Sequence, residues 1–185
     1  GVLRVWDATT GAQFSLQRGD PSELNSVSWI ADGRIVTAGL RTRARVWDPA
    51  PTPSPVRRRV ARDALVVRRS FQDELIIGTT GGVGLVDPRR LTTRGVTLSP
   101  GGVYSIAPLR AGDYLTGGGD GAVRRMDDSG AVLATSEPLG FIVVGLTVTP
   151  DERTAVATTA RGVVAALDAQ TLRVLWQRKI TDAPL

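Results

Sequence analysis

The sequence contains no cysteine and no histidine among its 185 residues. Without cysteine the chain can form neither a disulfide nor a thiolate nucleophile. Without histidine it lacks the side chain that most often acts as a general base and as a metal ligand. Ser-His-Asp catalysis and His-based zinc sites therefore cannot be built from this chain alone. We expect a non-enzymatic protein without a cofactor or a metal.

Long apolar runs are also missing. The longest one, from Phe141 to Leu146, is far too short for a transmembrane helix. The composition is 42% hydrophobic and 22% charged, which is ordinary for a globular domain. The length fits a single domain. We therefore expect a cytoplasmic protein that makes no contact with a membrane.

An aspartate that follows an apolar or aromatic stretch recurs along the whole chain. Successive members of this set are separated by 41, 39, 40 and 41 residues, and such regular spacing indicates structural repeats. In the first two copies a tryptophan precedes the aspartate, and in the later copies Val, Met or Leu takes its place. The repeat positions are Trp6-Asp7, Trp47-Asp48, Val86-Asp87, Met126-Asp127 and Leu167-Asp168.

Each period of about 40 residues contains four short runs rich in Val, Ile, Leu and Thr, separated by Gly, Pro and Asp turns. Such runs are typical of β-strands, and no stretch keeps a helical apolar stripe. In the second copy, for example, we expect strands over Ser26–Ile30, Arg34–Ala38 and Arg43–Trp47, with a hairpin turn at Ala31–Gly33. Four strands per period is the size of one β-propeller blade.

The second and third strands of the repeat resemble the WD-repeat family. Gly33–Gly39 followed by Arg43–Asp48 is similar to these strands, and Gly117–Arg124 is similar to the turn between them, including its aspartate at Asp120. The resemblance implies that the repeat tryptophans, and the residues replacing them, pack between blades. We expect the same role for Trp29 and Trp176. The His–Ser/Thr–Asp–Trp network of the family cannot form here, because there is no histidine.

The chain is thus expected to be all-β, with propeller blades of four antiparallel strands. Residues 1–185 would supply about 4.5 blades, with boundaries near 20, 62, 101 and 140, and 18 strands in total. Since 18 is not a multiple of four, the ring would be incomplete. A seven-blade ring needs roughly 280 residues, so we interpret the sequence as part of a longer protein.

Strand polarity places the turns on two rims. In the WD family, partners often bind on the rim that carries the turns between second and third strands and the connections between blades. The resemblance therefore predicts a protein-interaction surface on this rim, formed by Arg18, Arg41, Arg62, Thr80, Asp120 and Arg161. The alternative interpretation is that these are ordinary solvated turn residues.

The densest basic cluster comprises Arg57–Arg59 together with Arg62, Arg68 and Arg69. Arginines of this kind could contact phosphates of a nucleic acid. However, Val56 and Val60 place the first three on an outer strand, where arginine also protects an exposed sheet edge. Phe71 is the only aromatic residue nearby, so stacking partners for bases are scarce.

Three functions remain open at this point. The favoured one is a protein–protein interaction scaffold with an unknown protein partner. It would form the propeller part of a larger protein, for which a bacterial signalling protein is one candidate. The second is an enzyme or cofactor-binding propeller whose site lies in blades outside this sequence. The third is nucleic-acid binding through the arginine-rich surface, which the scarcity of nearby aromatic residues disfavours. Fold alone does not choose among them.

Overall fold

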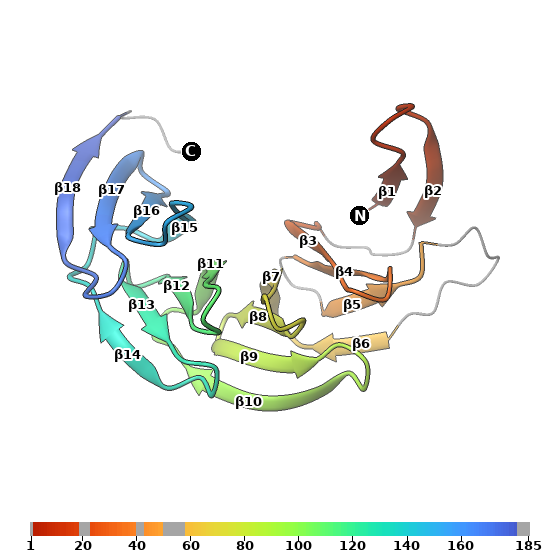
Figure 1. Cartoon of the computed structure of the whole chain (residues 1–185), viewed down its shortest axis with the longest axis horizontal. Coiled ribbons are helices and arrows are strands. Elements are labelled where there is room, and N and C mark those ends of the chain that lie inside the picture. Colours follow the sequence, from red (N-terminus) through yellow and green to blue (C-terminus); the bar gives the residue numbers. More distant parts are fainter. Residues whose placement is uncertain (1, 19–22, 40–42, 50–57, 181–185) are drawn as a thin grey trace.

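The computed structural model describes residues 2–18, 23–39, 43–49 and 58–180. These described residues form 18 β-strands and no helix. They form one two-stranded sheet and four four-stranded sheets, and paired strands are antiparallel throughout. The sheets follow one another as the blades of an open arc, with β1–β2 at one end and β15–β18 at the other (Figure 1). The predicted fold, an incomplete ring of propeller blades, is confirmed.

We call the strands of a blade a, b, c and d from the inside of the arc outward, and number the blades along the chain. Blade 1 holds only a c and a d strand, β1 (Val2–Trp6) and β2 (Gln13–Arg18). The other blades contain all four strands in simple order. Blade 2 consists of β3 (Ser26–Trp29), β4 (Ile35–Ala38), β5 (Ala44–Trp47) and β6 (Arg58–Ala61), and blade 3 of β7 (Ala64–Arg69), β8 (Leu75–Thr79), β9 (Gly82–Asp87) and β10 (Thr92–Leu98). Blade 4 consists of β11 (Val103–Pro108), β12 (Tyr114–Gly118), β13 (Val123–Met126) and β14 (Val132–Thr135), and blade 5 of β15 (Val143–Val148), β16 (Thr154–Thr159), β17 (Val163–Asp168) and β18 (Val174–Lys179).

The hydrophobic core lies between the blades. Successive side chains of a strand point to opposite faces of its sheet, so each blade has one apolar face for each neighbour. Blade 2 directs Val36 and Val46 toward blade 3, and Ile35 and Trp47 toward blade 1. Four clusters of buried residues result, one for each pair of successive blades. The cluster between blades 1 and 2 is the smallest.

The repeat tryptophan position is a packing position in blades 2 to 5. Trp47, Val86, Met126 and Leu167 are all buried at this position. The indole Nε1 of Trp47 also donates a hydrogen bond of 2.8 Å to Oγ1 of Thr37 on the neighbouring strand. Thus the tryptophan–threonine part of the family's network is present in blade 2, although the complete network is absent.

The other three tryptophans are not packed between two blades of the described structure. Trp6 is 56% exposed, Trp29 47% and Trp176 49%. Trp6 and Trp176 lie in the two terminal sheets of the arc, where no further blade covers them among the described residues (Figure 1). Trp29 lies at the end of the a strand β3, which faces the two-stranded blade 1. Burial at a repeat position therefore depends on the adjacent blade being complete.

Candidate interaction rims

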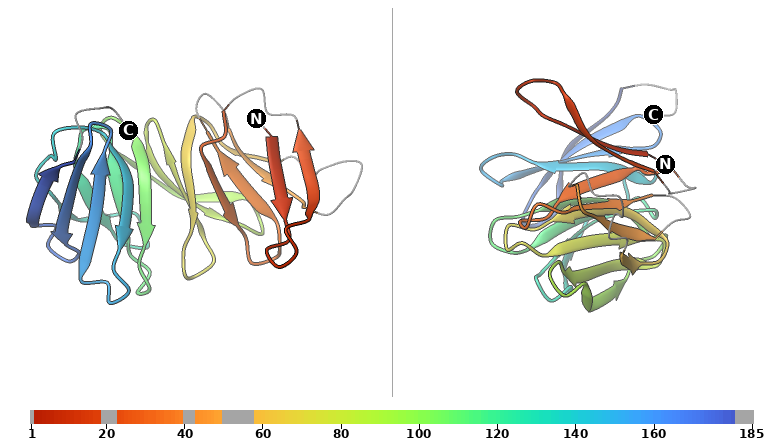
Figure 2. Two further views of the ribbon diagram at one scale, coloured as in Figure 1. Left: turned by 90° about the horizontal axis from the view of Figure 1, so that it is seen from above. Right: turned by 90° about the vertical axis from the view of Figure 1, so that its right-hand side faces the viewer.

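The connections between strands lie on two opposite rims of the arc (Figure 2). The b–c rim carries the b–c turns and the connections between blades, and the a–b rim carries the a–b and c–d turns. The b–c rim is the one that the sequence resemblance selects. Thr80, Asp120 and Arg161 lie in b–c turns and are exposed, and Arg62 is exposed in the connection between β6 and β7. Arg41 lies outside the described residues. Arg18 is the last residue of β2 rather than part of a connection.

Asp120 has a local partner in the next strand. Its carboxylate forms an ion pair with Arg124, and Oδ1 also accepts a hydrogen bond of 3.2 Å from the amide of Ala122. The hydrogen bond from Arg124, followed by the one from Ala122, holds the pKa of Asp120 below its usual range, although partial burial opposes this. Asp120 therefore stabilises its own turn and is largely neutralised for a partner.

Arg161 is held against an aromatic ring. Its guanidinium carbon lies 4.2 Å from the centroid of Phe141, a distance typical of a cation–π contact. Phe141 belongs to the connection between blades 4 and 5 and is 40% exposed. Arg161 forms no ion pair within the described part of the chain. The structure therefore combines a positioned cation and an exposed aromatic ring at the blade 4–blade 5 end of the b–c rim. Sequence analysis selected Arg161 but missed Phe141, which it noted only as the first residue of the longest apolar run.

The repeat aspartates lie at the ends of the c strands on the a–b rim, and four of them, Asp7, Asp87, Asp127 and Asp168, cap the c–d turns. Oδ1 of Asp7 accepts hydrogen bonds of 2.8 Å from the amides of Thr9 and Thr10. Oδ1 of Asp127 accepts bonds from the amides of Ser129 and Ala131 at 2.8 and 2.9 Å. These bonds use the local turn chemistry that aspartate favours. Asp87 and Asp168 bond in the same way to the amides two and three residues ahead.

These hydrogen bonds lower the pKa values of all four aspartates. For Asp7 the largest cause is the bond from the Thr10 amide, and for Asp87 the bond from the Arg90 amide. For Asp127 the largest cause is the bond from the Ser129 side chain, and for Asp168 the bond from the Thr171 amide. The regular spacing of these four aspartates thus reflects turn formation and not a shared binding site.

Successive a–b turns are also linked to each other. The amide of Ala31 in blade 2 donates to Oδ1 of Asp73 in blade 3 at 3.3 Å, and the amide of Arg110 in blade 4 donates to Oε1 of Glu152 in blade 5 at 2.9 Å. Between them, Nε2 of Gln72 donates to the Arg110 carbonyl at 3.1 Å. These bonds connect blades 2 to 5 along the a–b rim. The polar side chains of this rim therefore help to fix the position of each blade relative to the next.

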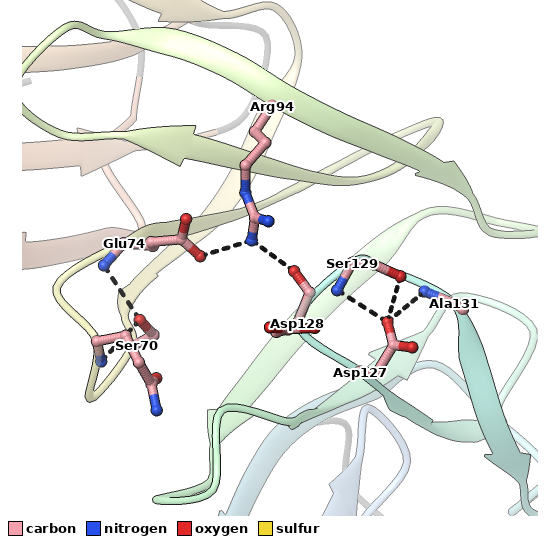
Figure 3. Close-up of polar contacts among 8 residues, drawn as sticks. Ser70, Glu74, Arg94, Asp127, Asp128, Ser129 and Ala131 are labelled. Carbon is pink, nitrogen blue, oxygen red and sulfur yellow. Dashed lines mark hydrogen bonds and ion pairs between the residues drawn. The ribbon is translucent and has the colours of Figure 1, made fainter.

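Arg94 of β10 joins blades 3 and 4 on the same rim (Figure 3). Its Nη2 donates to Oε2 of Glu74 at 2.9 Å and to the backbone carbonyl of Asp128 at 2.5 Å. A groove of about 320 Å³ lies here, lined by Gln72, Glu74, Arg94, Ala111, Gly112 and Asp128. Sequence analysis did not select Arg94, because its partners are 20 and 34 residues away and no motif links them.

The arginine-rich surface is dispersed in the structure. Arg57 lies outside the described residues, and Arg58 and Arg59 belong to the outer strand β6, as expected. Arg68 lies instead on the inner strand β7, where Nη1 donates to Ser26 Oγ at 3.0 Å and to the Val67 carbonyl at 2.9 Å. Arg69 forms an ion pair with Asp73 at 3.0 Å. Two of the six arginines are thus engaged in contacts within the protein.

No family model matches this sequence, and no curated protein shows significant similarity to it. Solved structures do resemble it. A chain in the crystal structure of the mitotic checkpoint complex is 19% identical with a TM-score of 0.73, and the match covers 87% of this chain and 52% of that chain. A computationally designed protein is 16% identical with a TM-score of 0.78, and the match covers 98% of this chain and 57% of that one.

This chain therefore spans about half the length of the solved structures that it matches. At such low sequence identities the matches establish the fold and nothing finer. The described residues contain no helix that could cross a membrane. They also contain no group of three or more acidic side chains placed to hold a metal ion. What the comparisons show is a repetitive all-β fold of the propeller type.

Proposed function

We propose that this chain is the propeller part of a WD-repeat protein and that it binds another protein through its b–c rim. The observation that carries the proposal is the Arg161–Phe141 pair. Loops on a rigid scaffold are common sites of function, and exposed aromatic and arginine side chains are the types most often found at the energetic centres of protein interfaces. Arg161 lies in the b–c turn of blade 5, and Phe141 lies in the connection that leads into this blade.

The charge of this part of the rim indicates which chemical groups a partner needs in order to bind it. Arg161 and Arg62 are exposed cations of the b–c rim without an ion pair in the described residues, whereas Asp120 is paired with Arg124. A partner with an acidic segment could pair with Arg161 while an apolar side chain covers Phe141. The likeness to a chain of a multi-protein assembly agrees with a scaffold role but rests on fold alone.

The test compares rim variants in a capture experiment with the full 185-residue chain. We expect Arg161→Glu to lose a protein that the unmodified chain retains, because the substitution reverses the charge and removes the cation–π contact. Arg90→Glu is the matched control, since Arg90 is an exposed arginine in a c–d turn of the opposite rim. Equal capture by all three proteins would refute the assignment to the b–c rim. Loss of binding in both variants would indicate a nonspecific charge effect.

A nucleic acid is the competing ligand. Its binding would weaken steeply with salt, because phosphate contacts release counterions. An electrophoretic assay of the chain with duplex DNA at low salt decides between the two. A shift that disappears as salt increases would overturn the protein-scaffold proposal, whereas the absence of a shift supports it.

A further inference from the structure

Consecutive blades are joined differently on the two rims. From blade 2 to blade 5, the chain passes from one blade to the next through the connections of the b–c rim. The a–b and c–d turns of the opposite rim each return to their own blade. In the described residues, the contacts between blades on the a–b rim are therefore noncovalent, whereas the b–c rim is covalently continuous.

Main-chain hydrogen bonds fix each connection of the b–c rim to both of the blades that it joins. Between blades 3 and 4, the amide of Ser99 donates to the Gly81 carbonyl, and the amide of Gly119 donates to the Gly102 carbonyl, both at 3.1 Å. Bonds of the same kind are found at the connections after blades 2 and 4, namely Thr80–Asp63, Gly39–Ala64, Leu139–Gly121 and Ala160–Ile142. This rim is therefore held without the use of charged side chains.

On the a–b rim, an arginine connects each pair of consecutive blades from blade 2 onward. Nη2 of Arg34 is paired with Asp32 in the a–b turn of blade 2 at 2.6 Å, and it also donates to the Pro88 carbonyl in the c–d turn of blade 3 at 2.7 Å. Arg94 makes the corresponding contacts between blades 3 and 4, with Glu74 and with the Asp128 carbonyl (Figure 3). Each arginine thus joins an acidic a–b turn to the c–d turn of the next blade.

Arg125 makes the same connection between blades 4 and 5. Its Nη2 is paired with Asp113 in the a–b turn of blade 4 at 2.6 Å, and its Nη1 donates to Oε1 of Gln170 in the c–d turn of blade 5. The three arginines occupy different positions of their blades, before β4, in β10 and in β13. Nevertheless, each contacts the residue one or two positions after the repeat aspartate of the next blade. We call these three sets of contacts the arginine bridges.

We propose that the arginine bridges form a charge-dependent clamp on the a–b rim, with the b–c rim as the hinge. Ion pairs between partly exposed groups weaken as salt screens their charges, whereas covalent connections and main-chain bonds do not depend on charge. Release of a bridge lets two consecutive blades tilt apart on the a–b rim while the b–c rim stays closed. This device does not rest on the protein-binding role proposed for the b–c rim.

Two amides at the junction of blades 4 and 5 report on the two rims separately. On the a–b rim, the amide of Arg110 in blade 4 donates to Oε1 of Glu152 in blade 5 at 2.9 Å, so this bond breaks when the blades tilt apart. On the b–c rim, the amide of Leu139 donates to the Gly121 carbonyl at 2.9 Å. The apolar cluster between these blades opposes wide opening. The tilt is therefore a local motion, of the kind that amide hydrogen exchange detects.

The test measures hydrogen exchange of these amides in the complete 185-residue chain and its variants. Gln170→Ala removes one end of the bridge at an exposed position, and it should speed exchange of the Arg110 amide about threefold, as expected for the loss of one hydrogen bond. Gln170→Glu turns the same contact into an ion pair with Arg125 and should slow this exchange about threefold. The exchange of the Leu139 amide should not change in either variant.

Two controls separate the bridge from other effects. Arg173→Ala removes an exposed charge from the same c–d turn without altering the bridge, so exchange of the Arg110 amide should stay as in the unmodified chain. In 1 M sodium chloride, where charges are screened within about 3 Å, Gln170→Glu should lose its advantage over the unmodified chain.

Three results would overturn the proposal. Equal acceleration of the Arg110 and Leu139 amides in Gln170→Ala would show general loosening and not a hinge. Unchanged exchange of the Arg110 amide in both Gln170 variants would show that the bridge does not hold the a–b rim closed. Slowing by Gln170→Glu that persists in 1 M sodium chloride would show that charge is not what closes the clamp. Each of these results concerns the a–b rim and leaves the capture experiment on the b–c rim unaffected.

Discussion

Replacement of the two repeat tryptophans by alanine should have very different effects. Trp47 and Trp6 occupy the same position of successive repeats, but Trp47 is 0% exposed and Trp6 is 56% exposed. Trp47→Ala removes a fully buried aromatic side chain, for which the usual loss is about 3–5 kcal/mol of unfolding free energy. Trp6→Ala removes a side chain without a covering blade and should change the stability by about 0.5 kcal/mol or less.

The structure also predicts where the Trp47→Ala protein opens first. Among the described residues, Leu3, Val5, Ile35 and Trp47 form the buried apolar cluster between blades 1 and 2. Removal of the indole leaves three aliphatic side chains of this cluster. We therefore expect amide exchange in β1 and β2 to become fast before the rest of the chain unfolds, as in other repeat proteins with nearest-neighbour coupling.

The hydrogen bond to Thr37 can be separated from packing. Trp47→Phe retains much of the ring volume but loses the Nε1 donor, which bonds to Thr37 Oγ1 at 2.8 Å. Combined with Thr37→Val in a double-mutant cycle, it should give a coupling energy of about 1 kcal/mol, the usual contribution of a buried hydrogen bond.

Urea unfolding followed by circular dichroism measures these changes without relying on tryptophan fluorescence. With a slope of about 2 kcal/mol per molar urea, Trp47→Ala should lower the midpoint by roughly 2 M, and Trp6→Ala should leave it nearly unchanged. Equal shifts for the two variants would refute the reasoning, because they would mean that Trp6 is as well packed as Trp47.

Two further predictions follow from the turns and the blade contacts. Gly117→Ala should lower the melting temperature, because its Cβ atom would lie 2.3 Å from Ser105 Oγ. Gly95→Ala should be tolerated, because the nearest atom to its Cβ would lie 3.5 Å away. Similar melting temperatures for the two variants would contradict the close packing around Gly117. The lowered pKa values of Asp7, Asp87, Asp127 and Asp168 add stability that is present above the unfolded pKa of about 3.9 and lost as pH falls through the folded values. Asp127→Asn retains an acceptor oxygen but cannot titrate, so the urea midpoint of this variant should fall less between pH 5 and pH 2, and an unchanged pH profile would argue against the turn-capping role.

The order of strands was predictable because the repeat is local. Each blade is a continuous stretch of about 40 residues, and its strands pair with their neighbours in sequence. Alternating apolar residues and turns rich in Gly and Asp therefore reveal β3, β4 and β5 with boundaries within one residue of those observed. The repeat aspartates were visible for the same reason, since their hydrogen-bond partners lie two to four residues ahead.

The side-chain contacts between blades were not predictable from spacing alone. Arg94 bonds to residues of two blades, and Gln72 bonds to a carbonyl 38 residues away. Phe141 belongs to an apolar run of the sequence, and only the structure shows that it lies in the connection between blades 4 and 5 and contacts Arg161. These contacts depend on how one sheet is rotated against the next, which leaves no periodic signal in the sequence.

The sequence by itself determined the all-β class, the four-stranded period and the absence of cysteine and histidine chemistry, because each depends only on residue type and on spacing along the chain. Only the tertiary structure decided which repeat positions are buried. Trp6 and Trp47 share a local motif, but burial is produced by a neighbouring blade that packs against one of them and not against the other. The exposure of Val27 has the same origin, because the described part of the chain places no inner strand of blade 1 against it.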